Sequence, residues 1–269
     1  MTSLAAILIV IALADWLYQG NEAAAGQLLS LLTAASLAIT AALLNWFSYD
    51  SWEVGLLTVL TVFVGILVWT RLRDQSSQSG RCLALAALTA AIAIGGLVTP
   101  ALAPVDVVQT SALHSYAASY LGKLPWTQLA DMSPELVFLI LATLLFLGST
   151  ANAIVKTVMT LIRTGDYEES GEQLKGGRYI GPLERWLIFG LALAGQPTAA
   201  ALVISAKSII RFPELQSKAR PRRSHDNDTG DSPHTAAQQI DELTEYFLIG
   251  SLLSWSLALL AALPIASIS

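Results

Sequence analysis

Charged residues are scarce in this chain of 269 residues. Lys, Arg, Asp and Glu together make up 13% of it, whereas hydrophobic residues make up 54%. A soluble domain usually carries about 25% charged residues. The mean hydropathy is +0.58, and the apolar residues fall in long runs. The composition therefore argues strongly against a water-soluble domain and indicates a polytopic membrane protein.

Other absences narrow the function. The single cysteine, Cys82, excludes an intramolecular disulfide and a cysteine-based zinc site. The sequence has no nucleophile–His–Asp set, phosphate-binding loop, dinucleotide fingerprint or metal-spaced histidine pair. We therefore expect no metal site and assign no catalytic residue or cofactor, so an enzyme is the less favoured class. A net charge of −5 argues against a nucleic-acid partner.

The apolar runs predict an all-α fold, because none of them shows the alternating polarity of a strand. We predict one integral membrane domain over residues 1–269, with six transmembrane helices and one re-entrant helical hairpin. No Lys or Arg precedes the first run, so we expect that run to remain as a helix rather than act as a cleavable signal. The six predicted spans are Leu4–Tyr18, Ala23–Trp46, Val54–Trp69, Cys82–Ala103, Leu136–Leu161 and Tyr246–Leu263.

The predicted hairpin covers residues 183–212. Ten apolar residues, Trp186–Gly195, are followed by Gln196 and Pro197 and then by a second apolar run. Gly followed by Pro is typical of one helix end and the next helix start. Ten residues rise about 15 Å, half of a roughly 30 Å hydrocarbon core. This pattern fits either a proline-kinked span or a hairpin that enters and leaves on the same side.

Basic residues favour the hairpin, because Lys and Arg mark cytoplasmic loops. A single span would send the basic residues after the broken run to the outside, whereas a hairpin keeps them inside with those of the earlier loops. Both termini are then predicted to lie outside. We predict an outer loop at 104–134 with an interfacial helix, a cytoplasmic loop at 163–179, and a disordered cytoplasmic insert at 213–240. The basic residues used are Arg71, Arg73, Arg81, Arg163, Lys175, Arg178, Lys218, Arg220, Arg222 and Arg223.

Charged residues in or beside membrane spans are candidate functional residues, because burying them is costly. The threading places a set of them at the cytoplasmic headgroup level. The set is Asp15, Lys156, Glu184, Arg185, Lys207, Arg211 and Glu245. Three interpretations remain open: snorkelling of the basic side chains, a structural ion-pair network, and a binding or permeation site. In the second, Glu184 or Glu245 pairs with a basic residue of the hairpin.

The hairpin tip is a separate candidate. Gln196 and Pro197 are predicted to lie near the bilayer midplane, where the second half-helix begins. Its unpaired N–H groups and positive dipole end would face the interior. Broken helices of this kind form substrate or ion sites in transporters. The alternative is that Gln196 only caps the turn.

Four blocks in the second half of the chain resemble a known family. They are Gly177–Arg185, Gly195-Gln196, Ala206–Phe212 and Glu245–Ser254. In this order they are similar to the bacterial membrane proteins of domain-of-unknown-function family 3307. The block Leu13–Gln19 is a looser match to the family's Asp block, and Ile11 stands where that family usually has a His. The resemblance implies a bacterial cytoplasmic-membrane location and favours Asp15, Glu184, Arg185, Lys207, Arg211 and Glu245 over Lys156.

Two classes of function follow from these patterns. In the first, the protein binds or translocates a small ion, solute or lipid headgroup through the charged cluster. In the second, it is a membrane scaffold or stress-signalling partner of cytoplasmic proteins, and the charges are purely structural. The expected partners are the lipid bilayer and either a second copy of the chain or a cytoplasmic protein.

Overall fold

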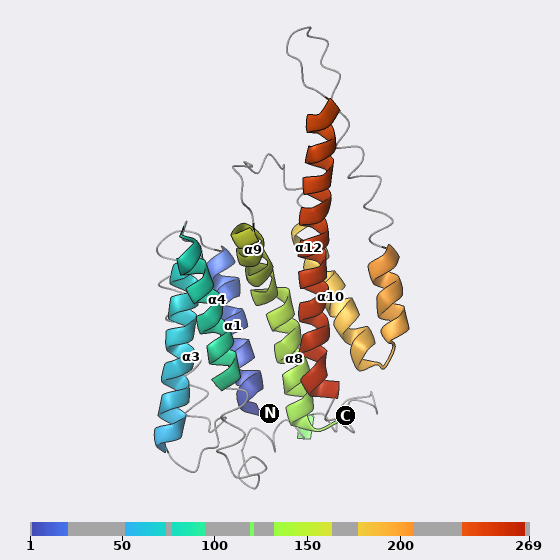
Figure 1. Ribbon diagram of the computed structural model, residues 1–269. Coiled ribbons are helices and arrows are strands. Elements are labelled where there is room, and N and C mark those ends of the chain that lie inside the picture. The colour runs from blue at the N-terminus through green and yellow to red at the C-terminus, as the bar shows by residue number, and fades with distance from the viewer. Residues whose placement is uncertain are drawn as a thin grey trace. The chain divides into compact units, whose positions relative to one another are not determined.

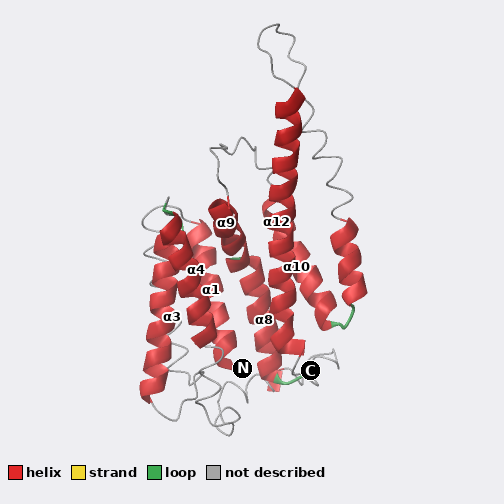
Figure 2. Cartoon of the chain, viewed as in Figure 1, coloured by secondary structure: helices red, strands yellow, loops and turns green. Residues whose placement is uncertain are grey.

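The computed structural model describes residues 2–20, 52–73, 77–94, 119–120, 132–162, 177–206 and 233–266. These residues form helices and the turns between them, and no strand occurs among them (Figures 1 and 2). The predicted all-α class is therefore confirmed for this part of the chain. The predicted span at 23–46 lies outside the described residues.

The chain divides into two compact units, Met1–Glu172 and Gln173–Ser269. The first contains α1 (Thr2–Gly20), α3 (Trp52–Leu72), α4 (Gln78–Ala93), α8 (Pro134–Gly148) and α9 (Thr150–Ile162). The second contains α10 (Gly177–Leu193), a helix at Pro197–Ala206, and α12 (Pro233–Ala266). The single integral membrane domain predicted over residues 1–269 stays a prediction.

Two described helices are long and apolar enough to cross a membrane: Pro134–Ile162, which comprises α8 and α9, and Phe247–Ala266 within α12. Four apolar helices are shorter: Leu4–Tyr18, Val59–Leu72, Gln78–Ala93 and Pro197–Ala206. A helix rises 1.5 Å per residue, so the whole of α3, with 21 residues, is about 31 Å long. The other three fall below the roughly 30 Å of a hydrocarbon core. The six predicted spans therefore stay a prediction.

Helix α1 contacts α3, α4, α8 and α9 within the first unit. Its buried side chains are mainly small or β-branched, among them Ala5, Ile7 and Ile11, which lets the neighbouring helices approach closely. Helices α3 and α4 meet at Gly65, where an added Cβ atom would lie 2.6 Å from the Cβ atom of Ala91. Small side chains therefore set the spacing of this bundle.

Side-chain contacts give the directions of these helices. Asp15, near the end of α1, contacts Trp69 and Arg73 at the end of α3, so the two helices run parallel (Figure 1). Arg81, in the first turn of α4, donates a hydrogen bond to the carbonyl of Thr160 in the last turn of α9 at 3.3 Å. Helices α4 and α9 therefore run antiparallel. The ends of α1, α3 and α9 and the start of α4 lie at one end of the first unit.

In the second unit the chain reverses after α10 (Figure 1). Gly195 has a φ of 65°, a left-handed conformation that favours glycine. The Gln196 amide donates to the Leu191 carbonyl at 2.9 Å, and the Gly195 amide donates to the Ala192 carbonyl at 3.1 Å. This pair of bonds is a Schellman motif, which closes the helix end. The next helix begins at Pro197, where proline's missing N–H group costs nothing.

Several predicted boundaries require correction. Helix α12 begins at Pro233, so residues 233–240 are helical rather than part of a disordered insert. Helix α10 begins at Gly177, so residues 177–179 are helical rather than part of the predicted loop. In both places the helix extends from an apolar segment into polar residues, since each added residue gains a backbone hydrogen bond. The rest of both segments, and nearly all of the loop at 104–134, lies outside the described residues.

Candidate functional site

The most deeply buried acidic side chain described is Asp15 of α1. Its exposed fraction is 0%, although α1 is otherwise almost wholly apolar. An isolated carboxylate in such surroundings would cost several kcal/mol, so a buried carboxylate requires a partner. The partner comes from the neighbouring parallel helix.

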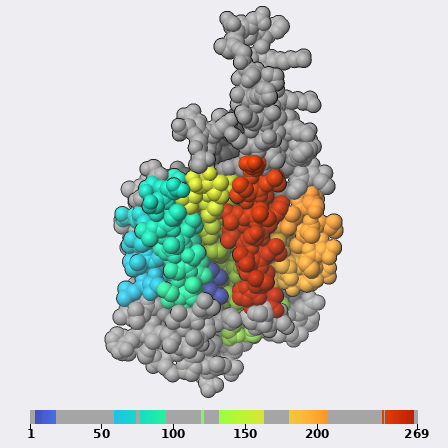
Figure 3. Space-filling model, viewed as in Figure 1, coloured from blue at the N-terminus to red at the C-terminus, as the bar shows by residue number. Residues whose placement is uncertain are grey.

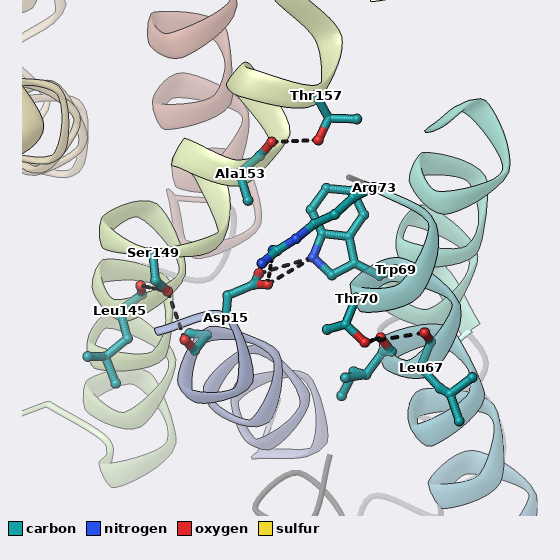
Figure 4. A network of polar contacts seen from close by, with 11 residues as sticks. Asp15, Leu67, Trp69, Thr70, Arg73, Leu145, Ser149, Ala153 and Thr157 are labelled. Carbon is teal, nitrogen blue, oxygen red and sulfur yellow. Dashed lines mark hydrogen bonds and ion pairs between the residues drawn. The ribbon is translucent and has the colours of Figure 1, made fainter. Parts of the chain in front are cut away.

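Trp69 and Arg73 lie one turn apart at the end of α3 and share a helix face. The indole N–H group of Trp69 donates to both carboxylate oxygens of Asp15, at 2.9 Å and 3.2 Å. The Nη1 atom of Arg73 forms an ion pair with Oδ1 of Asp15 (Figure 4). Trp69 is fully buried and Arg73 is 5% exposed. This ion pair is therefore shielded from solvent on both sides.

Two aromatic rings hold the Arg73 guanidinium group. Its central carbon lies 4.1 Å from the ring centroid of Tyr18 and 5.5 Å from that of Trp69. Both distances are within the range of a cation–π interaction. Tyr18 lies three residues after Asp15 on α1, so α1 supplies both the carboxylate and one of the rings. The rings therefore pack against the same guanidinium group that pairs with the carboxylate.

The break between α8 and α9 lies against the same part of α1. The Ser149 hydroxyl donates to the Ala12 carbonyl of α1 at 2.9 Å and also lies 2.9 Å from the Leu145 carbonyl (Figure 4). The next residue, Thr150, is fully buried. Its hydroxyl lies close to the Asp15 carboxyl group, but it has no hydrogen-bond partner among the described residues. Three segments therefore surround Asp15. We call Asp15, Tyr18, Trp69, Arg73 and Thr150 the Asp15 cluster.

The second unit holds another buried charge. Arg185 of α10 is 2% exposed and donates a hydrogen bond from Nη1 to the Ser254 hydroxyl of α12 at 2.9 Å. Glu184 precedes it and acts electrostatically on the guanidinium group. Ser254 belongs to a buried face of α12 that also contains Ser251 and Ala258. The arginine therefore links the hairpin to the last helix.

The six residues favoured by the family resemblance have different positions in the structure. Asp15 is paired with Arg73, and Arg185 is bonded to Ser254. Glu245 is exposed on α12, and Lys207 and Arg211 lie outside the described residues. The predicted pairing of Glu184 or Glu245 with a basic residue of the hairpin stays a prediction. Lys156, the seventh candidate, is exposed on α9.

The hairpin-tip residues Gln196 and Pro197 are both exposed. The Gln196 carbonyl accepts the first hydrogen bond of the following helix, from Ala200 at 3.2 Å, so its backbone caps that helix. Its predicted depth in a membrane stays a prediction.

Sequence reasoning missed the partners of Asp15. Arg73 was used only as a marker of a cytoplasmic loop, and Trp69 only as the last residue of a predicted span. Their spacing of four residues, at the end of a span predicted to finish level with Asp15, was the available signal. No such signal in the sequence indicates that Thr150 lies near Asp15, because its position depends on the helix break at Ser149.

Among the described residues, no group of three or more His, Cys, Asp or Glu side chains is positioned to hold a metal ion. Cys82 is exposed. Comparisons with protein-family models, with curated proteins and with solved structures found no match. The resemblance to domain-of-unknown-function family 3307 therefore stays a prediction, and the function must be argued from the geometry.

Proposed function

We propose that this protein is a multi-pass integral protein of the bacterial cytoplasmic membrane that acts as a scaffold for cytoplasmic proteins. The observation that carries the membrane location is the distribution of polar and apolar side chains. Asp15, Arg73 and Arg185 are buried, whereas large hydrophobic side chains are exposed on the described helices. Exposed examples are Leu60, Val64, Leu141, Leu187, Leu202, Leu252, Leu260 and Leu263.

This distribution reverses that of a water-soluble protein, in which charged side chains are rarely buried. Continuous exposed apolar surface is stable where lipid replaces water. Figure 3 displays the outward side chains of α4 and of α12, and the exposed members include Leu83 on α4 and Leu259 on α12. Both surfaces support the membrane location.

The helix directions also support the proposed threading. Helices α1 and α3 run parallel, which is the orientation expected if the predicted span at 23–46 lies between them. Helix α4 is antiparallel to α9, as expected if each crosses the membrane once. The end of the first unit that contains Asp15, Arg73 and Arg81 is the end that the basic residues predict to be cytoplasmic.

The Asp15 cluster favours a scaffold over a carrier. A carboxylate that binds a transported ion must offer oxygen atoms to it, but Trp69 already donates to both oxygens of Asp15, and Arg73 pairs with Oδ1. A buried pair of this kind is expected to hold helices in register. Helix α12 supports the cytoplasmic role, because it begins fourteen residues before Phe247. At 1.5 Å per residue this segment projects about 20 Å beyond the span.

The first test is ion flux. Purified protein in liposomes should give no protein-dependent proton, sodium or chloride flux beyond that of empty liposomes. Flux that disappears in Asp15→Asn would overturn the scaffold proposal and support transport. Failure of the protein to stay with membranes after alkaline carbonate washing would overturn the membrane location itself.

The second test is contact with a partner. A photo-crosslinking amino acid at Gln238, in the projecting part of α12, should give a discrete protein adduct in living cells. The matched control places it at Leu260, which is exposed within the span of the same helix. Identical adduct patterns at the two positions would contradict a cytoplasmic docking role for α12.

A further inference from the structure

At the cytoplasmic end of the first unit, the described basic side chains outnumber the described acidic ones. Four basic side chains are described there: Arg71, Arg73, Arg81 and Lys156. Among the described residues at that end, Asp15 is the one acid, and Arg73 neutralises it. The remaining three basic residues have no described carboxylate partner. A surplus of this kind at the inner membrane surface attracts anionic groups.

Two of these residues lie on neighbouring helices. Arg81 is half-buried, and one of its N–H groups donates to the Thr160 carbonyl of α9 at 3.3 Å. Lys156 is exposed on α9 one turn before Thr160. One turn is about 5.4 Å, so Lys156 lies about one turn along α9 from the residue that Arg81 contacts. Arg71 is also exposed, but it lies on α3.

We propose that Arg81 and Lys156 form a binding site for the phosphate group of an anionic phospholipid at the cytoplasmic ends of α4 and α9. This inference rests on the proposed membrane location. Lys156 lies six residues before the end of α9, about 9 Å into the membrane at 1.5 Å per residue. Its ammonium group therefore extends from the acyl-chain level toward the headgroups.

The depth of Lys156 argues for a lipid rather than a segment of this chain. A lipid phosphate is already at the headgroup level, and its acyl chains pack on apolar side chains below it. Leu85 lies one turn below Arg81 on the same face of α4 and is half-exposed. The acidic loop at 163–176 is the competing occupant and is distinguished by the experiment.

The experiment uses the full-length protein in nanodiscs of phosphatidylcholine alone or mixed with phosphatidylglycerol. Thermal unfolding is followed by tryptophan fluorescence, and retained lipid is identified by native mass spectrometry. Phosphatidylglycerol should raise Tm and remain bound to the protein. The double variant Arg81→Gln/Lys156→Gln should lose most of that rise. The matched control Arg71→Gln removes the same kind of charge from α3 and should keep the rise.

Each other outcome overturns the proposal. Equal loss of the rise in Arg71→Gln would show attraction to positive charge in general. A similar rise with inorganic phosphate in phosphatidylcholine nanodiscs would show a small-anion site rather than a lipid site. No response to phosphatidylglycerol, together with a lower Tm of Lys156→Gln in phosphatidylcholine, would assign Lys156 to the acidic loop. A protein that does not enter nanodiscs at all contradicts the proposed membrane location, whereas one that enters but ignores phosphatidylglycerol contradicts only the lipid site.

Discussion

Asp15 shows how one buried carboxylate organises its neighbours. It accepts hydrogen bonds from the Trp69 indole and forms an ion pair with Arg73, while Tyr18 stacks on the guanidinium group from the same helix as Asp15. The pair restricts the register of α1 against α3, because a slip of one turn would separate the Asp15 carboxylate from the Arg73 guanidinium group. Breaking a buried pair costs more than the pair itself stabilises, since the remaining charge stays desolvated.

The first prediction tests this pair by a double-mutant cycle. Asp15→Asn and Arg73→Gln should each destabilise the protein by about 3–5 kcal/mol, because each removes one charge of a buried ion pair and leaves the other desolvated. The double variant removes both charges, so its loss should be clearly smaller than the sum of the single losses. The measurement is thermal unfolding in detergent, supported by the yield of monodisperse protein. Arg71→Gln, at an exposed position, should change stability little. Additive losses would contradict direct coupling.

The indole hydrogen bonds give a second prediction at the same scale. Trp69→Phe keeps an aromatic ring near Arg73 but removes the donor to both oxygens of Asp15. We expect a loss of about 1.5–3 kcal/mol, the range for hydrogen bonds to charged groups. In the Asp15→Asn background the same change should cost less, since the acceptor is no longer charged. An equal cost in both backgrounds would assign the effect to packing alone.

At the scale of the helices, the sequence predicted well which segments form helices, but it predicted poorly which helices contact one another. The apolar runs placed α1, α3, α8–α9 and the end of α12, because hydrophobicity over a window is a local property. The contact of Trp69 and Arg73 with Asp15 joins residues more than fifty positions apart, and no local pattern encodes it. The start of α12 at Pro233 was missed for a related reason: polar residues continue a helix that the apolar span has already formed.

Glycine gives the third prediction, at the contact of α3 with α4. An alanine at position 65 would place its Cβ atom 2.6 Å from the Cβ atom of Ala91 and 3.2 Å from the Ala87 carbonyl oxygen. Gly65→Ala should therefore force the helices apart and cost about 1–3 kcal/mol. The matched control is Gly190→Ala in α10, where nothing lies within 4 Å of the added atom. That variant should be neutral or more stable by about 0.5–1 kcal/mol. Equal effects on Tm would contradict the close approach.

For the whole molecule, the decisive property is which end faces the cytoplasm. The described basic residues Arg71, Arg73 and Arg81 gather at one end of the first unit, and Ser133 caps α8 at the other. Positive charge is retained on the cytoplasmic side of bacterial membranes. The proposed threading then predicts that both termini lie outside. It predicts that the insert containing Ser224 lies inside if residues 183–212 form a hairpin rather than a single span.

The fourth prediction tests this threading with single cysteines placed in a Cys82→Ser background, because Cys82 is itself exposed. Ser133→Cys should react with a membrane-impermeant thiol reagent added to intact spheroplasts. Ser77→Cys and Ser224→Cys should react only after the membrane is opened. If Ser224→Cys reacts in intact spheroplasts and Ser77→Cys does not, residues 183–212 cross the membrane as a single proline-kinked span. One additional crossing would then move the insert outside. Labelling of Ser77→Cys with protection of Ser133→Cys would invert the first unit. That result would also remove Arg81 and Lys156 from the inner leaflet, where the proposed anionic phospholipid contacts them.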